Sequence, residues 1–387
     1  MEKIFRSLLF KVCCGIAFGI SIGLAAPENI MRLLITFKTL FANFLGFSIP
    51  LIMMGLIMPS IAELGKSAGK LLLITVGIAY SFTLFSGFST YLVGESLFPT
   101  LLQGEQLSNI GKDAEAIRPF FTIEMPPITD VMTSLVLSFI IGIGLSVREE
   151  STLSQMIKEF GEIVKWLISK AIIPLLPYYI LTIFAEISYS GQVMAIMTVF
   201  FKLIIILFAM HIVLLLIQYL IAGSIAGKNP FRSLLTMLPA YATALGTQSS
   251  AATIPVTLRQ AQKLGISSKI AGFVIPLCAT IHLSGSTMKI TACALALMML
   301  EGMPYDFMLF AGFVMMLGVI MVAAPGVPGG AIMAALGVLN SMLGFDERTQ
   351  GLMVALYIAM DSFGTACNVT GDGAVALIVN RISKIKD

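Results

Sequence analysis

The residues best suited to bind a charged solute lie near the C-terminus, in a stretch that is otherwise apolar. Four polar side chains follow one another there at steps of four, three and four residues: Asp361, Thr365, Asn368 and Asp372. On an α-helix these steps bring all four to one face. An ionisable residue inside a membrane helix is costly, so it usually faces a cavity or a partner. The stripe therefore predicts a helix face that lines a binding cavity; a buried polar network that only joins helices is the alternative.

A second polar group precedes this stripe in the chain. His282, Ser286 and Lys289 fall on one helix face, although Gly285 makes the phase less regular. Lys289 lies too deep in its apolar segment to reach the interface by extending its side chain. We expect it to pair with a carboxylate of the first stripe or to lose its proton. His282 is either a coupling residue or a core histidine with satisfied hydrogen bonds.

Two further polar clusters interrupt apolar segments. Ser249 and Ser250 lie at a break where backbone N–H groups are available, and a helix that begins there would favour a carboxylate. Gly326 and Val327 belong to a glycine-rich tip whose backbone can approach a ligand closely, and the tip could act as a gate.

The elements that must position these residues follow from composition. Of the 387 residues, 57% are hydrophobic and only 12% are charged, and the mean hydropathy is +0.95. A soluble protein cannot bury so much apolar surface. We therefore predict a polytopic helical membrane protein whose partners are the lipid bilayer and a small solute. Cytosolic enzymes and secreted domains are excluded, and a net charge of +3 suggests no nucleic-acid partner.

The predicted helices are those with roughly 20 apolar residues. We expect eight spans, near 8–26, 33–62, 70–97, 129–147, 166–188, 194–224, 268–299 and 352–380. Segments 231–262 and 305–343 are predicted to be helical hairpins that enter and leave by the same side, because broken backbone survives only inside protein or beside water. We expect breaks in the seventh and eighth helices at 282–287 and 367–373. Residues 98–128 are expected to be an extramembrane excursion, and residues 148–165 a solvated or interfacial linker.

The order hairpin, broken helix, hairpin, broken helix is an internal repeat, and such repeats indicate the binding site of a transporter. Basic residues at both ends favour cytoplasmic termini: Lys3, Arg6, Lys11, Arg381, Lys384 and Lys386. The five cysteines show no metal-ligand spacing and are expected to pack as small apolar residues.

Three motifs resemble those of the dicarboxylate/amino acid:cation symporter family, also called the glutamate transporter family. They are SSAATIPVT at 249–257, GVPGG at 326–330 and NVTGDG at 368–373. The resemblance implies an all-α fold with eight transmembrane helices, two re-entrant hairpins and inverted repeats. It also implies a homotrimer in the plasma (inner) membrane, with scaffold segments 1–66 and 99–190. Transport segments 67–98 and 191–387 would move as an elevator.

The same resemblance implies roles for residues. Asp361 would hold a substrate ammonium, and Asn368 with Ser249 and Ser250 would hold its carboxylate. The rest of the substrate pocket would come from Ser286, Gly326, Val327 and Thr365. Asn368 and Asp372 would bind a possible sodium ion, and no other cofactor is expected. Tyr80 and Thr83 are weaker matches to cation contacts. We also expect coupling roles for His282, Ser284 and Lys289.

Departures from the family pattern change these expectations. The seventh-helix signature Asn-Met-Asp-Gly-Thr is replaced by residues 282–286, His-Leu-Ser-Gly-Ser, so two sodium ligands are missing. Gly364 stands where members that carry acidic substrates have an arginine. We therefore expect a neutral amino acid rather than glutamate or aspartate, unless Lys289 supplies the positive charge of the missing arginine. Lys289 or a protonated His282 could replace the sodium ion, and proton coupling, a single remaining sodium site and sodium-independent exchange are all open.

Two other classes of function fit some of these residues. A channel or a sensor would keep the same pocket without moving solute in the same way. An intramembrane hydrolase could use Ser249 or Ser284 with His282, but no nucleophile-elbow pattern surrounds either serine. We predict a secondary transporter and not an enzyme.

Overall fold

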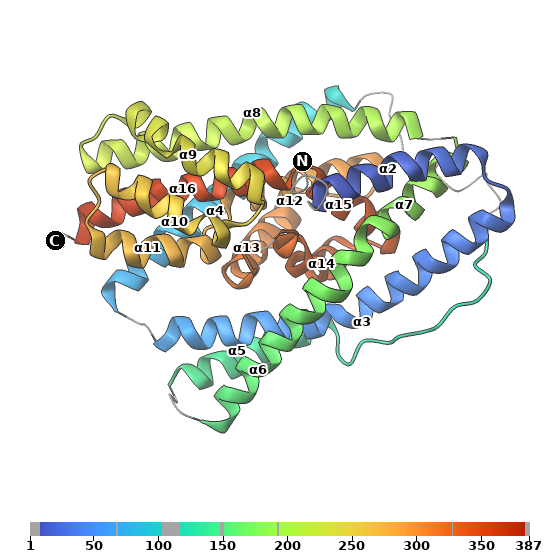
Figure 1. Ribbon diagram of the computed structural model, residues 1–387, viewed down its shortest axis with the longest axis horizontal. Coiled ribbons are helices and arrows are strands. Elements are labelled where there is room, and N and C mark those ends of the chain that lie inside the picture. Colours follow the sequence, from blue (N-terminus) through green and yellow to red (C-terminus); the bar gives the residue numbers. More distant parts are fainter. Residues whose placement is uncertain are drawn as a thin grey trace.

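The computed structural model describes residues 8–66, 69–102, 117–147, 151–191, 193–326 and 328–383 (Figure 1). Every regular element in those ranges is a helix, which confirms the all-helical prediction. Lys3, Arg6, Lys384 and Lys386, used above to orient the termini, lie outside the described residues.

One group of helices comes mainly from the N-terminal half. It consists of α2 (Leu8–Ala25), α3 (Glu28–Lys66), α5 (Val131–Ser146), α6 (Thr152–Leu167), the π-helical turn η1 (Ile168–Ile172) and α7 (Ile173–Tyr189). Helix α3 packs against α5, α6 and α7, and α2 packs along α7. Gly15, Gly19 and Gly23 allow that approach, since a Cβ atom at each would lie within 2.5 Å of a carbonyl oxygen of α7.

The remaining helices form a second group, in which two helices are buried in the centre. Helices α4 (Lys70–Leu101) and α8 (Val193–Ala226) flank α11 (Ser268–Ile281), α12 (Ser284–Glu301), α15 (Glu347–Ala359) and α16 (Asp361–Ser383). Helix α16 packs against α8, α11 and α12, and α12 packs against α4. Both α12 and α16 are buried along almost their whole length. In Figure 1, α8 follows one long edge of the molecule, and α5 and α6 lie at the opposite edge.

Both expected hairpins are present as pairs of helices packed together. The first joins α9 (Pro230–Thr247) to α10 (Ser250–Lys263), and the second joins α13 (Phe307–Ala323) to α14 (Gly330–Leu343). Each chain reversal uses a left-handed residue, Gln248 (φ 53°) in the first hairpin and Gly329 (φ 73°) in the second. Side chains of Asn229, Ser249 and Asp306 cap the helices that follow them.

Six helical segments of the described chain are long and apolar enough to cross a membrane: Leu8–Ala25, Glu28–Ala62, Lys70–Leu101, Thr152–Tyr189, Ile196–Ala226 and Ser268–Glu301. A seventh span results if α15 and α16, bent by 61°, count as one. The helix expected near 129–147 is α5, which has only 16 residues. The expected total of eight is therefore not confirmed, whereas a multi-span membrane protein is.

One prediction about local structure is wrong. The chain breaks between α15 and α16 at Met360 and runs as one helix through 367–373. The glycines there accommodate neighbours instead: a Cβ at Gly371 would lie 2.6 Å from side-chain atoms of Gln218 and His282. The solvated or interfacial linker predicted at 148–165 is helical from Thr152, where Ser151 caps α6.

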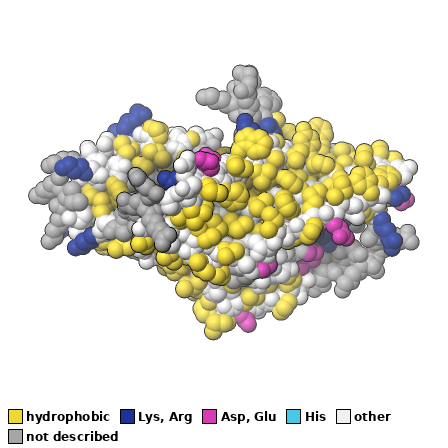
Figure 2. All heavy atoms as spheres, turned by 90° about the horizontal axis from the view of Figure 1, so that it is seen from below, with side chains coloured by type: hydrophobic (Ala, Val, Ile, Leu, Met, Phe, Trp, Pro, Cys, Tyr) yellow, Lys and Arg dark blue, Asp and Glu magenta, His cyan; other side chains and the backbone are white. Residues whose placement is uncertain are grey.

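The surface agrees with a lipid environment. Large hydrophobic side chains are exposed on most outer helices, among them Phe18, Leu33, Phe201 and Ile205. Figure 2 shows hydrophobic side chains across the middle of one face, with most Lys and Arg side chains toward its two ends. This distribution is the one that a bilayer selects.

Candidate functional site

Polar side chains of α12 and its preceding break meet those of α16 in three successive contacts. His282 contacts Asp372, Ser286 contacts Asn368, and Lys289 contacts Asp361. The residue numbers rise on one helix as they fall on the other, so the helices run antiparallel. We call these three contacts the polar ladder. The helical stripes predicted from the sequence therefore face each other, in the core of the molecule.

The Lys289–Asp361 contact is a fully buried ion pair with an Nζ–Oδ1 distance of 2.9 Å. Lys289 Nζ also lies 3.6 Å from the centroid of the Tyr357 ring, which adds a cation–π contact. The other carboxylate oxygen of Asp361 accepts a 2.9 Å hydrogen bond from the Gly329 N–H of the second hairpin. The expected pairing of Lys289 with a carboxylate of α16 is confirmed.

Gly364 makes room for this lysine. A Cβ atom at position 364 would lie 2.3 Å from Lys289 Cε and 2.7 Å from its Nζ. The lysine therefore occupies the space into which any side chain at 364 would grow. The sequence has no arginine at 364. The position of Lys289 explains this, because the lysine leaves no space there for a larger side chain.

In the middle contact, both polar atoms of the Asn368 side chain form hydrogen bonds. Its Oδ1 accepts the N–H groups of Gly285 (2.7 Å) and Ser286 (3.3 Å), which are unpaired at the start of α12. Its Nδ2 donates to Ser286 Oγ at 3.0 Å, and Tyr357 Oη donates to the same oxygen. In this conformation Asn368 fixes the broken backbone of α11 and α12.

The third contact joins His282 Nδ1 to Asp372 Oδ1 at 2.9 Å, and both side chains are buried. Helix α8 supports it from the side. Gln218 Nε2 lies 3.4 Å from His282 Nε2 and donates to Ser284 Oγ, and His211 Nε2 lies 3.1 Å from the Gly285 carbonyl. His282 and Ser284, expected to act in coupling, are thus held in a buried polar network.

The two hairpin tips meet beside the ladder. Ser249 Oγ donates to the Gly326 carbonyl at 2.8 Å and accepts from the Ala252 N–H as the cap of α10. Gln248 Nε2 donates to Ser362 Oγ on α16. The other predicted pocket residues, Ser250 and Thr365, are buried nearby in α10 and α16. Val327 lies outside the described residues.

The side chains expected to bind a sodium ion are engaged by the protein itself in this arrangement. A sodium ion needs oxygen atoms that are free to coordinate it. The oxygen of Asp372 that faces the break is bonded to His282, and Asn368 Oδ1 accepts two N–H groups.

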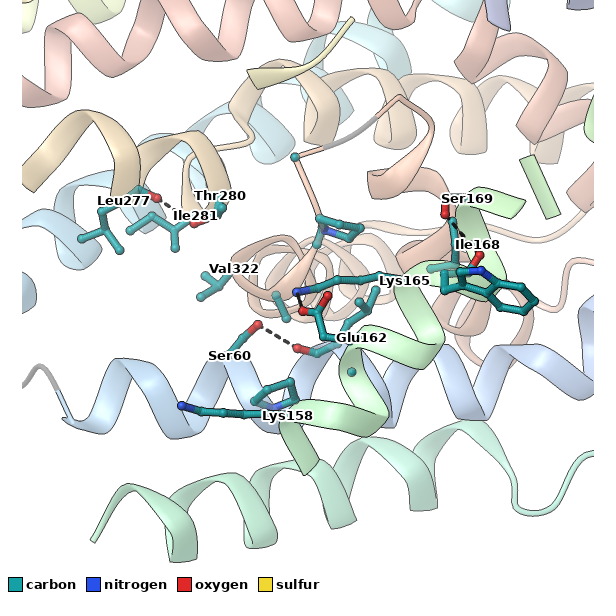
Figure 3. Close-up of a pocket in the computed structure, with 18 of the residues that line it drawn as sticks. Ser60, Lys158, Glu162, Lys165, Ile168, Ser169, Leu277, Thr280, Ile281 and Val322 are labelled. Atoms are coloured by element: carbon teal, nitrogen blue, oxygen red, sulfur yellow. Dashed lines mark hydrogen bonds and ion pairs between the residues drawn. The ribbon is translucent and has the colours of Figure 1, made fainter. Parts of the chain in front are cut away.

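A cavity of about 1010 Å³ leads to the tip of the second hairpin. One wall comes from α3, α6 and η1, and the other from Phe273–Ile281 of α11 and Val322–Gly326. Its charged lining consists of Lys158, Glu162 and Lys165 of α6. Figure 3 shows Lys158 and Lys165 on the α6 side and Thr280, Ile281 and Val322 across from them.

Several residues at the site had no signal in the sequence. Gln218 and Tyr219 lie in an apolar run of α8, and Tyr219 Oη donates to the Thr370 carbonyl. Tyr357 lies on α15, before the predicted polar stripe that begins at Asp361, so the stripe did not include it. Of the two weaker matches to cation contacts, Tyr80 Oη donates to the Met315 carbonyl, and Thr83 Oγ1 donates to the Ala79 carbonyl within α4. From α4 it is Ser86 that reaches the break, through the Ser284 carbonyl.

Known proteins resemble this chain over nearly its full length. The model of the sodium:dicarboxylate symporter family matches residues 8–382. The serine/threonine transporters SstT of Acinetobacter baumannii strains AYE, AB307-0294 and AB0057 are each 28% identical over 386 residues. The match covers 95% of this chain and 94% of each relative.

Proposed function

The chain belongs to the sodium:dicarboxylate symporter family, and from this membership we propose that it is a secondary transporter for a small amino acid or a related carboxylate. The relatives named as serine/threonine transporters support amino-acid transport. It is a transporter of this family and not an enzyme. The hydroxyl of Ser249, one nucleophile considered above, bonds to Gly326 of the opposite hairpin rather than to a histidine.

The observation that carries the proposal is the meeting of the hairpin tips over the polar ladder. Ser249 holds the Gly326 carbonyl, and the Gly329 N–H holds Asp361. Two hairpins whose tips meet beside buried charges form a site that one hairpin can open to one side of the membrane. Such a site binds a solute at mid-depth and excludes water while it moves.

We propose that the solute carries one carboxylate. Position 364 is a glycine whose space Lys289 fills, so the chain offers no arginine there to grip a second carboxylate. A neutral amino acid or a related monocarboxylate fits this site better than glutamate or aspartate. The α10 N-terminus behind Ser249 and Ser250 supplies backbone N–H groups of the right polarity for one carboxylate.

We propose further that transport does not require sodium. The 2.9 Å contact between His282 Nδ1 and Asp372 Oδ1 supports this proposal, because a protonated His282 would give Asp372 a cation from the protein itself. Proton coupling and exchange of one solute for another are both compatible with this pair. Sodium dependence would require His282 to leave Asp372.

The movement is proposed to be of the elevator type. Segments 67–98 and 191–387 would travel against a scaffold of 1–66 and 99–190, in a homotrimer of the plasma (inner) membrane with cytoplasmic termini. The packing described above supports the division, because α2, α3, α5, α6 and α7 contact one another extensively. With this topology the cavity at Val322–Gly326 opens toward the cytoplasm.

Counterflow in proteoliposomes tests the proposal. Vesicles are loaded with unlabelled alanine, serine, threonine, aspartate or small carboxylates, and uptake of the labelled compound is followed with and without a sodium gradient at two pH values. We expect accumulation of a compound with one carboxylate and no stimulation by sodium. Uptake without trans-acceleration would favour a channel, and binding without uptake would favour a sensor. An absolute requirement for sodium would contradict the coupling proposal.

A further inference from the structure

The charge balance of the polar ladder bears on the substrate, if the chain is the transporter proposed above. Asp361 has both carboxylate oxygens engaged, one by Lys289 Nζ and one by the Gly329 N–H, each at 2.9 Å. Asp372 is engaged by His282. The two carboxylates of the ladder therefore already have cationic or N–H partners from the protein itself.

Lys289 is held in place from every side. It is fully buried, its ammonium lies over the Tyr357 ring, and its side chain fills the space above Gly364. It cannot extend to an interface, because it lies in the second turn of α12, next to the break, among buried neighbours. A solute with an ammonium group would have to displace this ammonium from Asp361 and leave a second cation buried without a counter-ion, which is strongly unfavourable.

The charge of the cavity beside the second hairpin also favours an anionic solute. It is lined by Lys158, Lys165 and Glu162, a net charge of +1, and Lys165 pairs with Glu162 at 2.8 Å. The cavity ends at Pro325 and Gly326, next to the tip contact with Ser249. A positive vestibule attracts an anion and has no net attraction for a neutral zwitterion.

We infer that the solute is a short monocarboxylate without an amino group, and that Lys289 supplies the ammonium that an amino acid would bring. Gly364 then excludes a second carboxylate, and Lys289 excludes the amine. A 2-hydroxy acid or an unsubstituted short-chain acid meets both conditions. This inference narrows the proposed function to one substrate class of the same site.

The test compares L-lactate with L-alanine, which share a carbon skeleton and differ in a hydroxyl against an ammonium group. Competition and counterflow are measured on the full-length protein in proteoliposomes. We expect wild type to prefer lactate by at least about tenfold. Lys289→Met should reverse the preference, because Asp361 becomes free to accept the alanine ammonium. Lys202→Met is the matched control, since Lys202 contacts the Leu101 carbonyl at the end of α4, and it should keep the wild-type preference.

A double variant guards against misfolding of Lys289→Met, in which Asp361 lacks its partner. Lys289→Met with Asp361→Asn carries no unpaired charge, and it should not gain alanine binding. Gain of alanine in both variants, or preference of wild type for alanine over lactate, would overturn the inference while leaving transport intact. Counterflow of no amino acid and no carboxylate by folded protein would overturn the proposed transport function, and the inference with it.

Discussion

Single residues of the polar ladder decide which ions the site needs. In each of its outer contacts a basic side chain of the break or of α12 meets a carboxylate of α16, and both partners are buried. A buried carboxylate without a partner is far costlier than a paired one. Removing a basic side chain therefore leaves a buried carboxylate without a positive partner. A cation from solution can then bind that carboxylate.

The His282→Asn variant tests this demand directly. The shorter amide leaves Asp372 Oδ1 without its imidazole partner and offers a carbonyl oxygen, which suits a hard cation. We expect uptake by the variant to be stimulated about tenfold by sodium, equivalent to about 1.4 kcal/mol of added cation binding. Uptake in sodium chloride is compared with uptake in choline chloride.

His211→Asn is the control for this experiment. It removes a buried imidazole from the same region, but one that contacts the Gly285 carbonyl rather than a carboxylate. Sodium should not stimulate it. Equal stimulation of both variants, or of neither, would contradict the assignment of the cation position to the His282–Asp372 pair.

The ladder shows what residue spacing can and cannot predict. Steps of three and four residues correctly predicted that Asp361, Asn368 and Asp372 share a face, because a helix fixes that geometry locally. The sequence limited the partner of Lys289 to Asp361 or Asp372, since a buried ammonium group needs a carboxylate beside it. Gln218 and Tyr357 could not be found, because their contacts depend on which helix packs beside the break.

At the scale of helices, Ser249 has two tasks. It caps α10, and its hydroxyl also bonds to the Gly326 carbonyl of the other hairpin. The first task stabilises one helix, whereas the second joins the two tips. Substitution should therefore affect the closed site more than the fold.

Ser249→Ala and Ser267→Ala form a matched pair. Each serine caps a helix of 14 residues, α10 and α11 respectively, so each variant should lose about 1 kcal/mol of stability. Only Ser249→Ala loses a contact between tips, and its substrate affinity should fall about five- to tenfold. Thermal denaturation and substrate binding are measured side by side. Equal affinity loss in both variants would show that the tip contact contributes nothing.

The helix breaks were predicted with mixed success. The first break was expected at 282–287 and begins there, because His282 and Leu283 end one helix and start another. The second was expected at the glycines of 367–373 but lies at Met360. Small residues mark either a break or a close approach, and here neighbours from α8 and α9 pack onto Gly371 and Gly373. Only the tertiary packing separates these two uses.

The whole molecule contains two sets of helices that must slide if transport uses an elevator. Helix α3 of one set contacts α14 of the second hairpin. A Cβ at Gly337 of α14 would lie 3.2 Å from Cγ2 of Ile49. This contact crosses the boundary between the proposed scaffold and the proposed moving part.

A disulfide across that boundary should stop transport. Ile49→Cys with Gly337→Cys is introduced after the five native cysteines are replaced, and uptake is measured before and after oxidation. We expect at least about tenfold loss, reversed by reductant, since an intact bond fixes the two sets at one position. Persistent uptake with the bond formed would rule out sliding at this boundary.

Ile61→Cys with Gly142→Cys is the control pair. It also joins an isoleucine of α3 to a glycine, but within one set, because Gly142 lies on α5 against Ile61 Cβ. Its oxidation should leave uptake unchanged.

Composition sufficed to predict a helical membrane protein, because apolar content is a property of the whole chain. It could not give the number of spans, since α5 is shorter than a typical span.

The crowding between Lys289 and position 364 also restricts the order in which the site could have changed during evolution. A Cβ at 364 and the present lysine side chain would compete for the same few ångströms. A lineage that gains a side chain at 364 must therefore shorten residue 289 first, and for that interval Asp361 has no cation from the protein. We expect the two positions to covary among homologues, with a small residue at 364 wherever 289 is lysine.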